Sequence, residues 1–345
     1  MLQTRREGDN LTDFTTGILA QQIEGDLIAL LDDWASLGGV WDDSLDSQIH
    51  QWYVNPPKVW PQKPYFSPSS LGSCPRELYV KAKGAKRDAF RQKPHQRRQA
   101  DMGTLTGDYI QRELLFIEKH YEKKTGNSPK FRFLRDEQGR PRFEEFAKSS
   151  VRVSHEGEVF HLYGSPDGIM EYTTDAGEKI RVGLEIKSKA STAARTSHYS
   201  LKEPDASHAT QAKCYAKMFG CDYYVILYVN LAKKGWFMSE EDYAKTPDIR
   251  AFCLHVTEAD KLALLDKPAA ITKAVRENTP PPLDLDEWTF NSFKTACALD
   301  LSAEEFDELI AVNNRMQHSN LKDGKKRDYA AAIEFITETR KGTLQ

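Results

Sequence analysis

Apolar residues recur at helical spacing in two long stretches of this 345-residue chain. Residues 15–35 and 101–123 both place apolar side chains mostly three and four positions apart, which predicts two amphipathic helices. Residues 52–66 hold four prolines among aromatic side chains, so no regular element is expected there.

After Lys148 the pattern changes to short β-prone runs separated by turn sequences. The turn sequences are His155-Glu156-Gly157, Pro166-Asp167-Gly168 and Asp175-Ala176-Gly177, which are typical of chain reversals. The pattern therefore predicts an antiparallel meander of four strands, at 151–153, 159–163, 169–172 and 180–188.

A helix is expected next, with Asp205 as its N-cap and Gly220 as its C-cap residue. The uninterrupted apolar run at 223–229 predicts a central strand that is covered on both faces. With strand 180–188, these two elements form a right-handed βαβ crossover in a mixed sheet. From Leu254 onward the pattern is mainly helical, with a break at 280–282.

The predicted fold class is α/β, with a mixed sheet of about four to five strands flanked by helices. We divide the chain into an acidic helical and Pro/aromatic segment at 1–67, a core at 68–253 and a helical region at 254–345. The core carries a basic insertion at 76–98.

Composition excludes several classes of protein. The mean hydropathy is -0.62, and the chain has neither a long apolar run nor an apolar signal-peptide core, so we expect no membrane span and a cytoplasmic location in a bacterial or phage-infected cell. Five cysteines without close pairs indicate neither a disulfide framework nor a zinc knuckle.

The net charge of -3 hides an uneven distribution. Residues 1–50 carry ten acids and only two bases, whereas residues 76–98 carry nine bases and only two acids. A basic run is either a solvated face or a surface that neutralises phosphates.

The candidate chemistry lies at the turn 164–168 and in strand 180–188. Glu185 and Lys187 are two positions apart, so both project from one face of the strand, and Asp167 lies at the preceding hairpin corner. Two carboxylates, with the Ile186 carbonyl between Glu185 and Lys187, are oxygen ligands of the kind that Mg²⁺ takes. Lys187 would hold or deprotonate an attacking water, or stabilise developing charge; the sequence leaves these roles open.

At these residues the sequence resembles the PD-(D/E)XK nuclease superfamily, and within it the RecB-like and phage-exonuclease group. Pro166-Asp167 followed by Glu185-Ile186-Lys187 matches the paired motif of that superfamily. The resemblance implies a restriction-endonuclease-like core in which Asp167 and Glu185 bind Mg²⁺, or Mn²⁺ in its place, and Lys187 is the catalytic lysine.

Two further motifs extend the resemblance over about residues 68–230. Gln211 and Tyr215 match the family's Q-x-x-x-Y helix, which steadies the substrate backbone and the lysine. Residues 70–79 resemble the S-x-x-x-C-P-R-x-x-Y element, which makes Arg76 a candidate phosphate contact. Lys189 is a further candidate for contact with DNA.

The sequence departs from the family on the first core helix. Relatives often place a His or Glu four residues after a glycine there, but Gly103 is followed four residues later by Gly107. Asp108 is the candidate substitute ligand, with Gln111 and Glu113 behind it. Some relatives hold an iron-sulfur cluster through the equivalent of Cys74 and three carboxy-terminal cysteines; none is expected here, because the last third has only two unclustered cysteines.

The resulting hypothesis is a metal-dependent deoxyribonuclease, and most specifically an exonuclease of phage recombination or DNA degradation. DNA is the expected partner, and a single-strand-binding or recombination protein is a candidate second one. Two alternatives stay open: a structure-specific or sequence-specific endonuclease of the same fold, and a non-catalytic DNA-binding or assembly module. The oligomeric state does not follow from the sequence.

Overall fold

The computed structural model describes residues 4–342, and their side chains from residue 16 onward. The chain forms two compact units, each assembled from discontinuous segments. The first contains the described residues of 1–60, 92–151 and 163–264, and the second those of 61–91, 152–162 and 265–345. These units cut across the three continuous segments expected from the sequence, because the amino-terminal helix packs on the central sheet.

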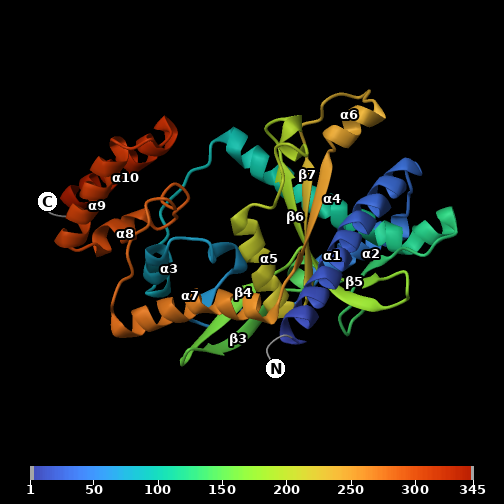
Figure 1. Ribbon diagram of the computed structural model, residues 1–345, viewed down its shortest axis with the longest axis horizontal. Helices are drawn as coiled ribbons and strands as arrows, with labels where there is room; N and C mark the ends of the chain where they lie inside the picture. Colours follow the sequence, from blue (N-terminus) through green and yellow to red (C-terminus); the bar gives the residue numbers. More distant parts are fainter. Residues whose placement is uncertain (1–3, 343–345) are drawn as a thin grey trace. The chain divides into compact units, whose positions relative to one another are not determined.

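A mixed five-stranded sheet forms the centre of the first unit, in the order β2-β5-β6-β7-β8 (Figure 1). Strands β6 and β7 are parallel, and the other neighbours are antiparallel. This sheet confirms the predicted fold class. The strands are β2 (Phe131–Phe133), β5 (Gly168–Thr173), β6 (Lys179–Lys189), β7 (Tyr223–Asn230) and β8 (Ile249–His255).

Helices cover both faces of this sheet. On one face, buried residues of α1 and α4 such as Leu27 and Ile117 form a core with Leu184 and Val225. On the other face, Ala212 and Ala216 of α5 pack among strand residues. The helical elements of this unit are α1 (Thr4–Ser36), α2 (Asp43–Val54), α4 (Pro94–Thr125), α5 (Ala206–Phe219) and α6 (Glu240–Lys245), with short 3₁₀ turns η2 (Glu144–Phe146) and η3 (Ala193–Thr196).

The second unit contains helices and most of a smaller sheet. This sheet has the order β1-β4-β3, and β1 runs parallel to β4. Its elements are β1 (Tyr65–Phe66), η1 (Pro68–Ser70), α3 (Pro75–Ala82), β3 (Ser149–His155), β4 (Glu158–Gly164), the larger part of α7 (Glu258–Glu277), α8 (Lys294–Asp300), α9 (Ala303–Gln317) and α10 (Asp323–Gly342).

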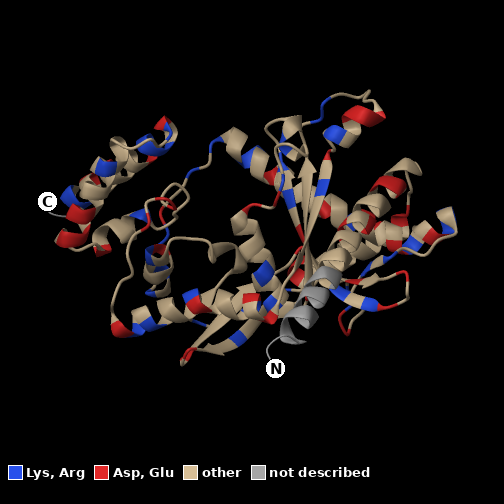
Figure 2. Ribbon diagram, viewed as in Figure 1, with Lys and Arg blue, Asp and Glu red and all other residues tan. Residues whose placement is uncertain are grey.

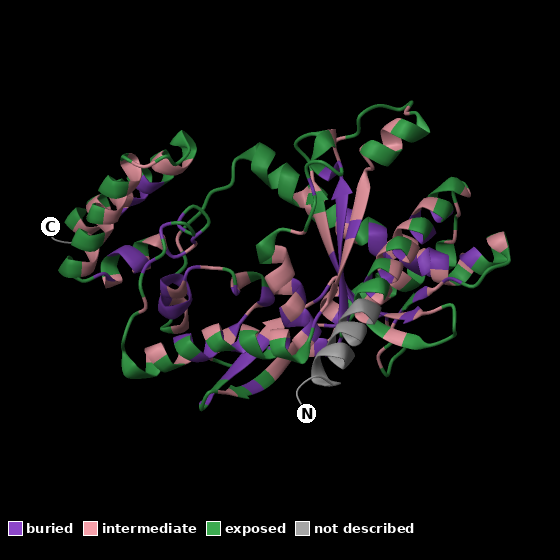
Figure 3. Cartoon of the chain, in the orientation of Figure 1, coloured by how far each residue is buried: buried purple, intermediate pink, exposed green. Residues whose placement is uncertain are grey.

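Most of the predicted elements are present. The two long helices form, although α4 begins at Pro94 rather than near residue 101. Asp205 and Gly220 cap α5, and Gly220 takes the left-handed conformation with φ 64°. Every residue of β7 is buried (Figure 3), and β6 and β7 pair in parallel, which confirms the central strand.

The single four-strand meander is wrong. β3 and β4 belong to the smaller sheet, whereas β5 and β6 belong to the five-stranded one. Pro166 lies between β4 and β5 and lacks a backbone N–H for pairing, and the free edge of β5 is taken by β2 instead. Strand β2 has only three residues, too few for a periodic signal in the sequence.

Within residues 4–342, no helix combines the length and the apolar character that crossing a membrane requires.

The close approach of β6 and β7 depends on a glycine. A Cβ atom on Gly183 would lie 2.0 Å from a ring carbon of Tyr224, which is fully buried and cannot move away. We expect Gly183→Ala to reduce the free energy of unfolding by about 1–3 kcal/mol, the usual effect of overpacking. Urea denaturation followed by circular dichroism measures this change.

The matched control is Gly25→Ala on the exposed side of α1, where a new Cβ would meet no atom within 4 Å. Alanine favours a helix over glycine by up to about 1 kcal/mol, so this variant should be slightly more stable than the parent. Equal stability of the two variants would contradict the packing argument.

Candidate active site

Asp167 and Glu185 are brought together by the pairing of β5 and β6. Gly168 pairs with Leu184 in the antiparallel register, so the preceding Asp167 lies beside Glu185 on the next strand. One Asp167 carboxylate oxygen accepts a hydrogen bond of 2.6 Å from the Ile186 backbone N–H. The hairpin corner therefore places the first carboxylate against the strand that carries the second.

Glu185 and Lys187 share the face of β6 that is covered by α5. Their neighbours Leu184 and Ile186 pack in the core on the opposite face, as the alternation predicts. The Lys187 ammonium lies 2.6 Å from a Glu185 carboxylate oxygen, and the Glu185 side chain is only 3% exposed. The ion pair compensates a charge that would otherwise be costly to bury.

Gln211 of α5 bridges this ion pair. Its side-chain Nε2 donates to Glu185 Oε1 over 2.7 Å, and its Oε1 accepts from Lys187 Nζ over 3.0 Å. Tyr215, one helical turn later, donates its hydroxyl to the Ser165 carbonyl over 2.7 Å. The helix thus fixes both the lysine and the turn that carries Asp167, and the expected contact of these two residues with substrate remains a prediction.

The two carboxyl groups ionise reluctantly in this setting. Burial, followed by the charge of Glu185, raises the pKa of Asp167 to about 7, although the Ile186 N–H and Lys187 oppose the shift. Burial also raises the pKa of Glu185, against the charge of Lys187. Carboxyl groups with raised pKa values beside a lysine are frequent at functional sites.

The donor set fits a hard divalent cation. Glu185 Oε2 is buried and has no hydrogen-bond partner, which leaves a carboxylate oxygen available for a ligand. In the part of the chain that the structure describes, no group of three or more His, Cys, Asp or Glu residues is arranged around a metal position. Mg²⁺ requires no such cage, because one or two carboxylates with water and phosphate oxygens are sufficient.

Helix α4 contributes Gln111 rather than Asp108 to the turn at Asp167. Gln111 Nε2 donates to the Asp167 carbonyl over 2.9 Å. In the sequence, Gln111 is four residues after Gly107. Asp108 is exposed at the rim of a cavity of about 340 Å³ that Gln111 also lines. Glu113 faces another side of α4, where it accepts a hydrogen bond from Trp34.

Glu144 is an acidic neighbour that the sequence reasoning missed. Its backbone N–H donates to the Pro166 carbonyl over 2.8 Å, and its carboxylate accepts from the Tyr53 hydroxyl over 3.2 Å. Burial raises the pKa of Glu144, and the charges of Asp108 and Asp167 raise it further. Its φ of 45° is rare for a glutamate, and neither this backbone conformation nor its position has a local sequence signal.

Lys189 lies at the carboxyl end of β6, where its ammonium is already paired. It lies 2.8 Å from the Asp205 carboxylate and over the ring of Tyr228. His208 of α5 is also at this end, 2.9 Å from the Tyr228 hydroxyl, and burial and the charge of Lys187 lower its pKa to about 4. The expected contact between Lys189 and DNA would require it to exchange this partner.

The phosphate contact expected of Arg76 is inconsistent with its position. Arg76 is fully buried in the second unit, where its guanidinium pairs with the carboxylates of Asp300 and Glu305 and donates to the Pro281 carbonyl. A buried arginine with these partners holds helices together and does not reach solvent.

The end of the basic insertion is accessible to solvent. Residues 91–98 are all exposed, and Figure 2 shows the lysines and arginines of the chain in blue.

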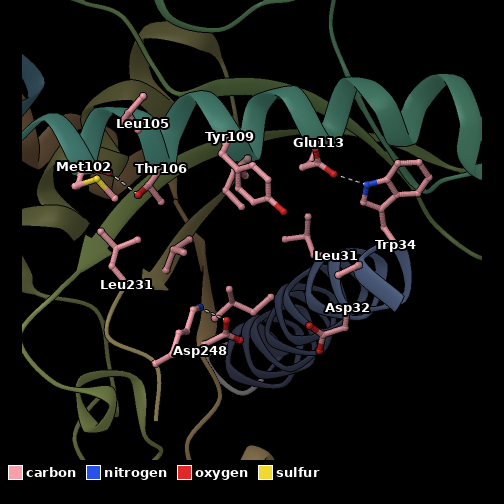
Figure 4. A pocket seen from close by; sticks show the side chains of 15 residues that line it. Leu31, Asp32, Trp34, Met102, Leu105, Thr106, Tyr109, Glu113, Leu231 and Asp248 are labelled. Atoms are coloured by element: carbon pink, nitrogen blue, oxygen red, sulfur yellow. Dashed lines mark hydrogen bonds and ion pairs between the residues drawn. The ribbon is translucent and has the colours of Figure 1, made fainter. Parts of the chain in front are cut away.

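A separate cavity of about 450 Å³ lies on the opposite face of the sheet, between α1 and α4 (Figure 4). Its walls include Leu31, Leu105 and Tyr109. Its charged side chains are engaged: Glu113 with Trp34, Asp32 with Tyr243, and Lys233 with Asp248. This mainly apolar cavity offers no convergent set of groups for acid, base or metal chemistry. The candidate active site is therefore the polar cluster under α5.

No family model and no curated protein matches the chain. Among solved structures, it is similar to SSO0001 with 14% identity and a TM-score of 0.37, over 75% of this chain and 95% of the other. It is also similar to the alkaline exonuclease LHK-Exo from Laribacter hongkongensis, with 10% identity and a TM-score of 0.34 over 62% of this chain and 89% of the other. The complex of LHK-Exo with dAMP gives 11% identity and a TM-score of 0.33, over 62% and 88%.

Similarities at these TM-scores carry no argument about chemistry, so the interpretation of the site depends on its own geometry.

The raised pKa of Asp167 predicts a pH-dependent stability. The folded protein favours the protonated carboxyl, so its contribution to stability is lost as the pH rises from the ordinary pKa of 3.8 through about 7. We expect Asp167→Asn to increase the free energy of unfolding of the metal-free protein at about pH 8 by about 1 kcal/mol or more, and by less at about pH 5.

Urea unfolding with a chelator at the two pH values measures the difference. The exposed Asp307→Asn substitution in α9 provides the baseline. A gain for Asp167→Asn that does not grow with pH would show that Asp167 is ionised without cost in the folded protein.

Proposed function

We propose that this protein is a metal-dependent nuclease that hydrolyses phosphodiester bonds of DNA at the cluster of Asp167, Glu185 and Lys187. The observation that carries the proposal is the buried Glu185, which is ion-paired to Lys187, bridged by Gln211 and left with one unpartnered oxygen beside Asp167. A purely structural ion pair would not need a second carboxylate at the same place, because adjacent acids raise each other's pKa.

The residues that would hold Mg²⁺ are Asp167 and Glu185, together with the Ile186 carbonyl. When bound, the ion lowers the pKa of a coordinated water and neutralises charge on the phosphate. Its positive charge would also favour the ionised form of both carboxylates, which burial disfavours in the metal-free protein.

Lys187 is positioned to act on the attacking water or on the phosphate. Its side chain is 22% exposed, so its ammonium can reach a substrate while Glu185 and Gln211 hold it in place. In both roles the ammonium must lie within hydrogen-bond distance of the reacting atoms, and a side chain that is held in one position meets this requirement. Tyr215 and Gln111 keep the Ser165 to Asp167 turn from moving away from it.

The finer proposal is an exonuclease that acts in phage recombination or DNA degradation, with a single-strand-binding or recombination protein as a partner. It is supported by the sequence resemblance, including the Gln211 and Tyr215 helix motif, whose side chains are engaged with the lysine and the Asp167 turn. The exposed bases of residues 91–98 add a positive surface that would attract DNA without reading its sequence.

Removing either charged member of the ion pair should abolish activity. We expect Glu185→Gln and Lys187→Met to lower the rate of Mg²⁺-dependent DNA hydrolysis by at least about a hundredfold, since each removes a group that acts on the reacting phosphate or its metal. Release of nucleotides from labelled DNA, measured with Mg²⁺ and with a chelator, reports this rate.

The matched controls are Glu178→Gln and Lys179→Met, which change the same residue types at exposed positions before and at the start of β6. Both controls should retain the parental rate, and circular dichroism should show all four variants folded. Cleavage by Glu185→Gln and Lys187→Met at the parental rate would refute the assignment of the site.

The choice between exonuclease and endonuclease is tested with DNA of two topologies. An exonuclease requires an end, so we expect the protein to degrade a linear duplex in Mg²⁺ and to leave a covalently closed circle intact. Gel electrophoresis of both substrates measures this, with a linearised sample of the same plasmid as the control. Cutting of the closed circle would favour the endonuclease instead.

A further inference from the structure

The loop of residues 231–239, between β7 and α6, displays two adjacent aromatic rings to solvent. Trp236 and Phe237 are each 94% exposed, next to Gly235 and after Lys233 and Lys234. Single exposed apolar residues are ordinary, but two adjacent large rings that make almost no contact with the protein indicate an interaction site.

This loop begins beside the candidate active site. β6 and β7 run in parallel with Lys189 opposite Asn230, and the Leu231 N–H donates to the Lys189 carbonyl over 2.7 Å. The loop therefore leaves the sheet next to the residue that lies two positions after Lys187. Loops at the carboxyl ends of parallel strands are the usual location of ligands in α/β proteins.

The segment that follows β6 also carries an exposed aromatic ring and a lysine, and it is hydrogen-bonded to the end of β7. Asn230 donates its side-chain amide to the carbonyls of Thr192 and Ala193, over 3.0 and 2.9 Å. Farther along this segment, Tyr199 is 86% exposed, and the Lys202 ammonium lies 5.7 Å from the centre of its ring. Both loops at this end of the sheet thus combine an exposed aromatic ring with lysine.

A cavity of about 460 Å³ lies under the first loop. Lys233, Lys234, Trp236 and Met238 line one part of it, and Ala193 of the second loop is also in its wall. This volume is within the range of pockets that bind small ligands. Lys233 and Lys234 pair with Asp248 and Asp242, but about half of each lysine side chain is exposed, and such pairs are weak enough for a phosphate to replace.

We propose that the loop of residues 231–239 binds the single-stranded end of a DNA substrate, with bases stacked on Trp236 and Phe237 and phosphates beside Lys233 and Lys234. This inference builds on the proposed nuclease function and adds the form of DNA that the site receives. Aromatic rings interleaved with cations are the means by which proteins bind single strands without reading sequence. The adjacent rings alone would suit a membrane or a protein, but the lysines and the start of the loop next to Lys189, two residues after Lys187, favour DNA.

The test measures binding separately from cleavage. Labelled duplexes with a 5′ overhang, a 3′ overhang or blunt ends are titrated with the full chain in a chelator, and fluorescence anisotropy gives each Kd. Stacking contributes about 1–3 kcal/mol per base, so the Trp236→Ala/Phe237→Ala double variant should raise the Kd for at least one overhang by at least about tenfold. Its Kd for the blunt duplex should be unchanged.

Three controls define the result. Trp41→Ala removes a ring that is 88% exposed elsewhere on the first unit and should leave every Kd unchanged. Trp236→Phe keeps a stacking surface and should retain most of the affinity. The Lys233→Ala/Lys234→Ala variant should reduce the slope of log Kd against log salt by about 1.4, since each phosphate contact on a single strand contributes about 0.7.

The inference would be overturned if the Trp236→Ala/Phe237→Ala variant bound both overhangs with the same Kd as the parent protein. If that variant instead loses binding to anionic phospholipid vesicles, or if it alone changes oligomeric state, the rings serve a membrane or a second copy of the chain. When the parent protein still cleaves DNA in Mg²⁺, these outcomes refute the loop assignment only. A parent that neither binds nor cleaves DNA refutes the proposed function as well.

Discussion

The ion pair between Glu185 and Lys187 is the interaction on which the site depends. A carboxylate that is almost completely inaccessible to water needs a compensating charge, and the lysine two residues later on the same strand provides it. Gln211 forms a hydrogen bond with each partner, so helix α5 is held in one position along β6. One buried charge therefore determines the rotamer of the lysine and the placement of the helix.

The fold allows this arrangement because one face of β6 is apolar and packs in the core, whereas the other carries the charged side chains. Its apolar face joins the core under α1 and α4, where burial of large side chains provides the stabilising free energy. Its other face is free to carry charged groups that the fold does not need for packing. Asp167 is added to them by the turn before β5, which Gln111, Glu144 and Tyr215 hold through backbone carbonyls.

The same division explains why cavity size is a poor guide to chemistry in this protein. The apolar cavity between α1 and α4 is well formed, but its charged side chains are engaged in the surrounding structure, as Glu113 is with Trp34 (Figure 4). At the carboxyl ends of β6 and β7, by contrast, the chain leaves the sheet in loops rich in lysine and exposed rings. Loops carry such groups at little cost to the fold, because their side chains contribute little to the core.

The sequence alone determined the features that depend on a few neighbouring residues: the alternation of side chains in β6, the fully buried apolar strand β7 and the caps of α5. Only the tertiary structure decided which distant segments meet. It separated β4 from β5, buried Arg76 against Asp300 and brought Glu144 to the Asp167 turn. Strand and helix periods act over a few residues, whereas such contacts depend on how whole elements pack, so a motif can identify a residue without revealing whether it faces solvent, a partner or the core.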